Sequence, residues 1–364
     1  MYSKTLDDPA QIKQIDSEDM LGKVSLLGPH LKLSFDEALK NDVPYKDIDS
    51  ILFFGLGGSG ITGDVINNYL LPISKVPVAV AKANYLPKYV GKKTLCIGLS
   101  YSGNTSETVA CFKEAVKKQA KTIAITSGGK IEELAKQNGS VLVKLPGDYP
   151  PRSALGLLTG AALGCLYKTG LFNTIAEDIA KTVSFLENQK TKYEPTSPVQ
   201  ENPAKKIAAE LTDTIPLIYG SESVGFTTAN RWKAQINENA KVMAFYNFFP
   251  ELAHNEIMAD CKNKSCIVYL KNPDEKAEQL ITNSVALKLM KAKNNKIIEI
   301  AAEGDTELEK MFSLIMLGDF ISVYMAIVKG VDPTPVGKIT RLKEELKKKA
   351  KPGPEKIDVA SSSF

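Results

Sequence analysis

Residues 51–64 read ILFFGLGGSGITGD, an apolar run that passes through a glycine-rich turn into a segment with helical character. Within it Gly55, Gly57 and Gly60 have the G-x-G-x-x-G spacing of a dinucleotide-binding turn. The spacing predicts a buried strand, a tight turn and a helix, in that order. It does not fix the ligand, because any tight turn between a strand and a helix favours glycine.

The segment after this turn tests whether the ligand is a dinucleotide. A dinucleotide-binding unit carries an acidic residue about 20 residues further on, where its carboxylate holds the ribose hydroxyls. The chain instead offers Lys82 and Asn84 at the end of VPVAVAKAN (76–84). Since a lysine suits a 2′-phosphate, the missing acid argues against NAD more strongly than against NADP.

Short apolar runs alternate with helix-length segments along most of the chain, and this alternation predicts the fold class. Runs rich in β-branched residues and bounded by turn signals are typical of buried strands, and their alternation with helices predicts a parallel sheet covered on both faces. We therefore expect an α/β protein with two domains, each a mainly parallel sheet flanked by helices. The expected strands are ILFFGL (51–56), VPVAVA (76–81), TLCIGLS (94–100), KTIAITS (121–127), SVLVKL (140–145), IPLIYG (215–220), KVMAFY (241–246), SCIVYL (265–270) and KIIEIAA (296–302).

A polar, proline-bearing segment interrupts the alternation between the two halves and is the expected linker. Each half closes with a long apolar helix. The expected divisions are a helical leader at 1–44, a first domain at 45–186, the linker at 187–203, a second domain at 204–332, and a C-terminal helix and tail at 333–364.

Composition limits the classes of protein that the chain can belong to. Its 364 residues, 43% of them hydrophobic, suffice for two cores. Much of the net charge of +4 lies in LKEELKKKAKPGPEK (342–356). No aromatic residue interleaves with these lysines, which favours a solvated helix face over a nucleic-acid or membrane site. We expect neither nucleic acid nor membrane as a partner.

Three further features indicate a cytoplasmic protein. The N-terminus is polar, so no secretory signal is expected. The apolar stretch 311–330 carries Asp319 near its middle, so it is predicted to be a buried helix of a soluble protein rather than a membrane span. The chain has only two histidines, which argues against a histidine-rich metal site, and five scattered cysteines without a C-x-x-C pair, expected to be reduced thiols: Cys96, Cys111, Cys165, Cys261 and Cys266.

A second loop, IGLSYSGNTSETV (97–109), indicates the ligand more clearly than the glycine-rich turn does. A strand leads into a cluster of hydroxyl and amide side chains at the first turn of a helix, where free N–H groups and the helix dipole attract anions. Two such loops side by side favour a small monophosphate over a dinucleotide. The alternative is a capping box made by Asn104 and Glu107. The cluster comprises Ser100, Ser102, Asn104, Thr105 and Ser106.

Together GLGGSG (55–60) and LSYSGNTSET (99–108) resemble the sugar isomerase (SIS) domain, which binds phosphosugars. The chain is similar to the bifunctional phosphoglucose/phosphomannose isomerases, a family of two-SIS-domain enzymes of archaea and bacteria. Four later segments, in the family's order, carry this likeness: PRSALG (151–156), NENAK (237–241), ELAHNEI (251–257) and GVDPTPV…LKEEL (330–346).

The resemblance implies a flavodoxin-like fold for each SIS-type domain. It also implies interconversion of glucose 6-phosphate, and mannose 6-phosphate, with fructose 6-phosphate, without cofactor or metal. A cytoplasmic role in glycolysis and gluconeogenesis follows. In this family the enzyme is a homodimer. By the resemblance the substrate phosphate is held by Gly58, Ser59, Ser100, Ser102 and Thr105.

The resemblance also assigns two catalytic residues within the motifs. Arg152 follows Pro150 and Pro151, which restrict its backbone, and is expected to stabilise the enediolate. Glu238 is expected to be the base that moves a proton between C2 and C1. Periodicity by itself predicts an exposed Glu238, because it lies away from the apolar face formed by Trp232, Ile236 and Met243.

Two further catalytic residues are expected to open the sugar ring. His254 is one of them, since an imidazole can give and take a proton near neutral pH, and in the family this histidine completes the partner's site. For the lysine that helps it, a helix capped by Thr334 and beginning at Pro335 gives an apolar arc of Val336, Ile339, Leu342 and Leu346. Lys343 lies inside this arc and Lys338 outside it, so we expect an inward Lys343. Related isomerases can carry threonine or glutamine where this chain has Val336, which leaves the discrimination between the two aldoses open.

Three alternatives to an isomerase remain from the sequence. One is a regulator with the SIS fold that binds a sugar phosphate without turnover. Another is an NADP oxidoreductase, which the doubled phosphate loop argues against. The last is a transferase built on paired SIS domains, which normally adds an N-terminal amidotransferase domain.

Overall fold

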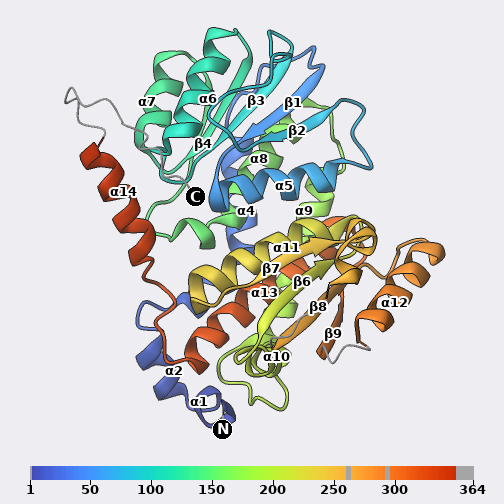
Figure 1. The fold of residues 1–364 in the computed structure, drawn as a ribbon. Coiled ribbons are helices and arrows are strands. Elements are labelled where there is room, and N and C mark those ends of the chain that lie inside the picture. The colour runs from blue at the N-terminus through green and yellow to red at the C-terminus, as the bar shows by residue number, and fades with distance from the viewer. Residues whose placement is uncertain (1, 260–263, 292–295, 350–364) are drawn as a thin grey trace, which may run out of the picture.

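The computed structural model describes residues 2–259, 264–291 and 296–349 and contains two parallel sheets, one above the other (Figure 1). The first sheet has the strand order β2-β1-β3-β4-β5, and the second has the order β7-β6-β8-β9. Every neighbouring pair of strands is parallel. The predicted α/β class is confirmed, and the first sheet has the flavodoxin-like order 2-1-3-4-5.

The strands follow the apolar runs of the sequence, and several in the interior of the sheets are almost fully buried. In the first sheet they are β1 Ser50–Phe54, β2 Val78–Ala81, β3 Thr94–Leu99, β4 Lys121–Thr126 and β5 Val141–Lys144. In the second they are β6 Ile215–Gly220, β7 Phe245–Phe248, β8 Ser265–Lys271 and β9 Lys296–Ala301. The prediction was wrong for β7, expected at 241–246. Lys241 has a φ of 57°, which ends the preceding helix, and the strand begins four residues later. Met243 therefore leaves the expected apolar face and is 67% exposed.

The helices cover both sheets and join them. Those before the linker region are α1 Tyr2–Leu6, α2 Pro9–Ile15, α3 Met20–Ser25, α4 Leu27–Leu39, α5 Gly57–Leu70, α6 Ser106–Lys117, α7 Gly129–Gln137, η1 Pro151–Ser153, α8 Leu155–Thr169 and α9 Ile175–Lys190. The remaining ones, from the linker onward, are η2 Thr191–Tyr193, α10 Pro203–Leu211, α11 Val224–Gln235, the π-helical η3 Ile236–Ala240, η4 Glu251–His254, η5 Glu256–Met258, α12 Ala277–Lys291, α13 Glu307–Val328 and α14 Gly337–Lys349. Helices α5 and α11, one from each domain, pack against each other.

The N-terminal leader is helical, as expected, and its described residues form four helices. The carboxylate of Asp16 accepts hydrogen bonds from the backbone N–H groups of Met20 and Leu21, and Asp19 caps α3 with a φ of 53°. These aspartates end one helix and begin the next. Helices α1 and α3 pack on α13, so the leader reaches across to the second domain (Figure 1).

The first part of the expected linker is helical. Helix α9 continues four residues past the predicted boundary at 186, and η2 follows at once. Tyr193 is 3% exposed, and its carbonyl accepts the hydroxyl of Tyr324. The segment 194–202 between η2 and α10 has only turns and irregular structure.

The long apolar stretch near the C-terminus is confirmed as a core helix. Among the described residues α13 is the one helix long and apolar enough to cross a membrane, and 94% of its most apolar window is buried inside the protein. Asp319 at its centre forms an ion pair with Arg231. The cysteines at 96, 111, 165 and 266 are free and buried. Cys261 and the tail after residue 349 lie outside the described residues.

Candidate active site

The two predicted phosphate loops lie side by side at the carboxyl ends of β1 and β3. The hydroxyl of Ser59, in the first turn of α5, accepts a hydrogen bond from the backbone N–H of Tyr101 at 3.2 Å. Close approach of these loops to their neighbours excludes larger side chains. A Cβ on Gly103, whose φ is +65°, would lie 1.6 Å from the carbonyl oxygen of Gly128. Glycine at position 103 is therefore required by both backbone conformation and space.

The hydroxyl groups of the second loop are not used to cap α6. The N-cap residue is Thr105, whose side chain makes no capping hydrogen bond, and Asn104 accepts the backbone N–H of Lys130 instead. The capping-box alternative for Asn104 and Glu107 is therefore wrong. In the described structure the Ser100 hydroxyl is buried without a hydrogen-bond partner. A buried, unpaired hydroxyl at an anion-binding turn is available to a phosphate oxygen.

The remaining phosphate-loop residues lie at the surface of the same turn. Ser102 is exposed and Thr105 is partly buried. The Ser102 hydroxyl accepts only a long hydrogen bond, 3.4 Å, from the backbone N–H of Asn104. Gly58 lies against η1, because a Cβ on it would be 3.0 Å from the carbonyl oxygen of Pro151. The phosphate loops therefore adjoin the short helix that carries Arg152.

Arg152 reaches from the first domain into the second. It is 5% exposed, and its Nε donates to Oδ1 of Asn239 at 2.6 Å. Its Nη2 donates to the carbonyl oxygens of Pro333 and Thr334, both at 2.8 Å. Burial lowers the pKa of Arg152 from its ordinary value, and the nearby Glu238 opposes this shift. Nη1 lies 3.7 Å from Oε2 of Glu238.

Glu238 lies in the π-helical turn η3, and its side chain is 32% exposed. π-helical turns occur often at functional sites because the extra residue changes the direction of side chains. Glu238 is thus more sheltered than periodicity predicted. Lys241, at the end of this turn, donates to the carbonyl oxygens of Glu238 and Pro333. Burial and the charge of Arg152 lower the pKa of Lys241.

His254 and Lys343 do not join this cluster within the described chain. His254 ends η4, is exposed and has no hydrogen-bond partner among the described residues. Lys343 is exposed on α14, which extends away from the body of the protein (Figure 1). The expectation of an inward lysine on a packed apolar arc is wrong for the single chain, because Ile339, Leu342 and Leu346 are 40%, 59% and 58% exposed.

The start of α14 also differs from the prediction. The helix begins at Gly337 instead of Pro335, and Thr334 does not cap it. The backbone N–H of Thr334 donates to Asp332, and its carbonyl is taken by Arg152. The contact with Arg152 thus holds this segment in an irregular conformation. Val336 is partly buried at its end.

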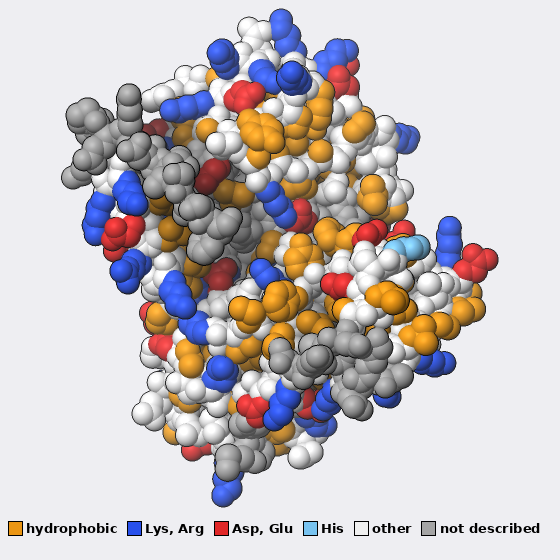
Figure 2. Space-filling view, in the orientation of Figure 1, with side chains coloured by type: hydrophobic (Ala, Val, Ile, Leu, Met, Phe, Trp, Pro, Cys, Tyr) orange, Lys and Arg blue, Asp and Glu red, His pale blue; other side chains and the backbone are white. Residues whose placement is uncertain are grey.

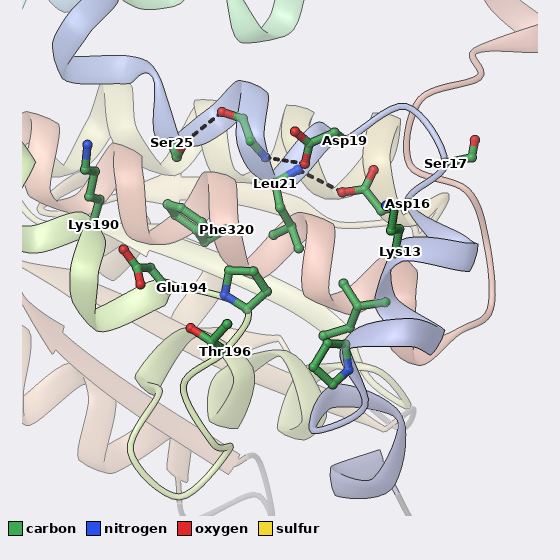
Figure 3. Close-up of a pocket in the computed structure, with 14 residues that line it drawn as sticks. Lys13, Asp16, Ser17, Asp19, Leu21, Ser25, Lys190, Glu194, Thr196 and Phe320 are labelled. Atoms are coloured by element: carbon green, nitrogen blue, oxygen red, sulfur yellow. Dashed lines mark hydrogen bonds between the residues drawn. The ribbon is translucent and has the colours of Figure 1, made fainter.

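Two other features of the described chain argue against NADP binding and against a ligand site elsewhere. Lys82, which could have bound a 2′-phosphate, forms an ion pair with Asp64 of α5. A cavity of about 700 Å³ lies between the N-terminal helices, the segment after α9 and Phe320 (Figure 3). None of the predicted site residues lines it. Two of its acidic side chains accept backbone hydrogen bonds, Asp16 from Leu21 and Asp19 from Gly22 (Figure 3).

Sequence reasoning missed several residues of the cluster. Asn239, Lys241 and Arg231 gave no separate signal, although the first two fall inside the NENAK motif. The charge of Asp319 within an apolar stretch was used only as an argument against a membrane span. A carboxylate in the middle of an apolar helix requires a buried partner, and Arg231 is that partner.

Two parallel sheets flanked by helices, with a hydroxyl-lined loop at a helix N-terminus, are typical of a protein with paired SIS domains. The model of the SIS domain matches residues 45–141, and the model of the bacterial phospho-glucose isomerase C-terminal SIS domain matches residues 200–346. The chain belongs to the family of bifunctional phosphoglucose/phosphomannose isomerases. The member from Caldicellulosiruptor bescii is 39% identical over 310 residues, covering 84% of this chain and 91% of that protein. The member from Aquifex aeolicus is 36% identical over 331 residues, covering 89% and 97%.

Other relatives share less. A D-glucosamine-6-phosphate 4-epimerase from Sulfolobus acidocaldarius is 34% identical over 225 residues, covering 61% of this chain and 68% of that protein. Among solved structures, a glucose-6-phosphate isomerase like protein from Thermus thermophilus aligns with a TM-score of 0.61 at 18% identity, covering 93% of this chain and 98% of that one. At that identity the likeness shows the fold.

Proposed function

We propose that this protein is an aldose–ketose isomerase that interconverts glucose 6-phosphate, and mannose 6-phosphate, with fructose 6-phosphate. The observation that carries the proposal is the position of Nη1 of Arg152, 3.7 Å from the Glu238 carboxylate, on an element that adjoins the phosphate loop at Gly58. A base and a fixed cation next to a phosphate site are what proton transfer through an enediolate requires.

The proposed steps use groups of this chain. Phosphate binding by the hydroxyl-lined loops places the sugar chain toward the second domain. Glu238 removes the proton from C2 of the open-chain aldose and returns it to C1, while O1 and O2 share the enediolate charge beside Nη1 of Arg152. Acceptance of both C2 epimers requires the enediol to turn so that one base reaches either face. The isomerisation is redox-neutral overall, so it consumes no oxidant or reductant, and the proposal assigns it no cofactor or metal.

Ring opening is proposed for His254 with Lys343, and the active assembly is proposed to be a homodimer in which each His254 serves the partner's site. Two exposed apolar surfaces support this proposal: the arc on α14, and a stripe of Ile281, Val285 and Leu289 on α12. Figure 2 shows hydrophobic side chains on the lobe that carries α12. Exposed apolar surface of this kind is typical of an interaction site.

A shared site makes a specific prediction for mixed dimers. Variants Glu238→Gln and His254→Ala would each be inactive alone. Subunit exchange in an equal mixture gives mixed dimers with one intact site, and activity returns to about a quarter of that of the wild type. If no activity returns although exchange is complete, the donation of His254 is wrong.

We place the enzyme in the cytoplasm, acting on hexose phosphates of glycolysis and gluconeogenesis. Free thiols at the described cysteines support a reducing compartment. The decisive test is an assay of glucose 6-phosphate and mannose 6-phosphate with chelator and without added cofactor. Glucosamine 6-phosphate serves as a third substrate, because one relative is an epimerase of that sugar.

The matched variants are Glu238→Gln and the exposed Glu299→Gln on β9. Loss of the general base is expected to lower kcat by roughly 10²- to 10⁴-fold, whereas Glu299→Gln keeps the wild-type rate. Absence of turnover with both aldose phosphates, or full activity of Glu238→Gln, would refute the proposed function. Binding without turnover would favour the SIS-fold regulator.

A further inference from the structure

The guanidinium of Arg152 is held by uncharged acceptors on two of its three nitrogens. Nε donates to the amide oxygen of Asn239, and Nη2 donates to two backbone carbonyls. These acceptors satisfy the donors without cancelling the positive charge. Nη1 is left facing Glu238, at a distance longer than a hydrogen bond. The position of Nη1, the nitrogen of Arg152 that is available to a substrate, is therefore fixed by the hydrogen bonds of the other two nitrogens.

The contact with Asn239 is one link of a closed ring of hydrogen bonds. Asn239 donates through Nδ2 to the hydroxyl of Ser322 at 2.9 Å, and Ser322 donates to the carbonyl oxygen of Asp319 at 2.7 Å. The Asp319 carboxylate accepts both Nε and Nη2 of Arg231, at 3.0 and 2.6 Å. Nη2 of Arg231 also donates to the carbonyl oxygen of Arg152 at 3.0 Å, which closes the ring.

The ring lies in the dry interior and joins both domains. None of its members is more than 5% exposed: Arg152, Arg231, Asn239, Asp319 and Ser322. Arg152 comes from η1 of the first domain, and the other members come from α11, η3 and α13 of the second. A fully satisfied buried polar network rigidifies the groups in it, whereas a broken one leaves an unpaired buried group.

The π-helical turn explains how one short segment serves both the site and the ring. Glu238 and Asn239 are consecutive, yet the first is partly exposed beside Arg152 and the second is fully buried against Ser322. The position of Asn239 thus fixes the Arg152 guanidinium and the backbone that carries Glu238 at the same time.

We propose that Asn239, supported by Ser322, Asp319 and Arg231, is a positioning residue that fixes Nη1 of Arg152 opposite Glu238, and that its neutral amide preserves the charge of Arg152 for the enediolate. The proposal rests on the proposed isomerase function and deepens it. Asn239 acts through Arg152 and does not touch the sugar. Its loss should therefore reduce the rate of proton transfer and leave phosphate binding intact.

The test replaces the amide by a carboxylate of nearly the same shape. Asn239→Asp would form a direct ion pair with Arg152 and withdraw its charge from the substrate. We expect kcat to fall about 100-fold, the order found on loss of one oxyanion donor, while KM stays within about threefold. The affinity for inorganic phosphate, measured by calorimetry, should also stay within about threefold, because Ser59 and Ser100 are untouched.

Two further variants separate positioning from stability. Ser322→Ala opens the ring at an uncharged link, so it remains informative if Asn239→Asp does not fold; kcat is expected to fall several-fold with unchanged KM. Asn283→Ala removes another fully buried asparagine of the second domain, which donates to Tyr269. It is expected to lower the melting temperature and leave kcat unchanged.

The outcomes distinguish this inference from the proposed function. If the wild-type protein isomerises neither sugar, the proposed function fails and the positioning role fails with it. If the wild type is active and both ring variants keep full kcat, the positioning role alone is refuted. Equal losses of kcat in Ser322→Ala and Asn283→Ala would assign the ring a purely structural role and would also refute it.

Discussion

The Ser100 hydroxyl offers a test of the phosphate site in which stability and binding change in opposite directions. Ser100 is 1% exposed, and its Oγ has no partner among the described residues. A buried hydroxyl without a hydrogen-bond partner in the protein costs about 1–3 kcal/mol. We therefore expect Ser100→Ala to leave the free energy of unfolding unchanged or raise it by up to about 1 kcal/mol, since part of the gain is offset by the small cavity left.

Binding should respond in the other direction. A hydrogen bond from a hydroxyl to a phosphate oxygen contributes about 1.5–3 kcal/mol, so kcat/KM for glucose 6-phosphate should fall roughly 10- to 150-fold at about 1.4 kcal/mol per tenfold. The change should appear mainly in KM, because the phosphate is bound in both the ground state and the transition state. The same variant should lose most of the thermal stabilisation that inorganic phosphate gives the wild type.

The matched control is Thr159→Val. Thr159 is fully buried in α8, and its hydroxyl also lacks a partner among the described residues. This nearly isosteric change should raise stability to a similar extent and leave KM unaltered. Urea unfolding and steady-state kinetics of the two variants decide the matter. A marked loss of stability in Ser100→Ala, or an unchanged KM, would show that the hydroxyl is not kept for a phosphate.

Three other predictions concern different parts of the molecule. Gly103→Ala should destabilise the protein by more than about 2 kcal/mol, whereas Gly170→Ala, also at positive φ but with open space around it, should cost about 1 kcal/mol; thermal unfolding compares them, and equal losses would contradict the clash with Gly128. Burial raises the pKa of Glu275 from 4.5 to about 6. The folded state then binds more protons than the unfolded state between these values, so stability should fall as pH rises through pH 4.5–6, by about 1 kcal/mol once solvent screening of a partly exposed group is allowed for. Glu275→Gln should remove this slope in urea titrations at several pH values, and an unchanged slope would refute the assignment. Leu342→Asp on the exposed arc of α14 should change the unfolding free energy of the single chain by less than about 0.5 kcal/mol yet weaken the proposed dimer in sedimentation experiments; an unaltered dimer would exclude α14 from the interface.

The alternation of apolar runs and helices was sufficient to predict the architecture. Eight of the nine expected strands coincide with observed ones to within two residues at both ends, because strands packed between helices form short apolar runs bounded by turn residues. The ninth was shifted because no local pattern shows that Lys241 ends a helix in a left-handed conformation. The break of the leader at Asp16 and Asp19 was likewise hidden, since capping depends on backbone groups that only the folded chain presents.

The candidate site, like the fold, was predicted only in part from the sequence. Spacing and residue type predicted the two phosphate loops, because anion binding at a helix N-terminus is a local property of a strand–turn–helix unit. Periodicity predicted an exposed Glu238 and a buried Lys343. In the single chain the Glu238 side chain is partly buried and Lys343 is exposed. Periodicity assumes a regular helix packed on its own chain, whereas η3 is π-helical and α14 leaves the body of the protein.

The sequence by itself determined two α/β domains and the motifs that identify the family, and it predicted a monophosphate site in the first domain. Only the tertiary structure decided that Arg152 is held by Asn239 and by the carbonyls of Pro333 and Thr334, more than 80 residues away along the chain. The physical reason is that a buried guanidinium must find acceptors for its N–H groups wherever the fold supplies them. Those partners come from distant elements, and no spacing in the sequence records them.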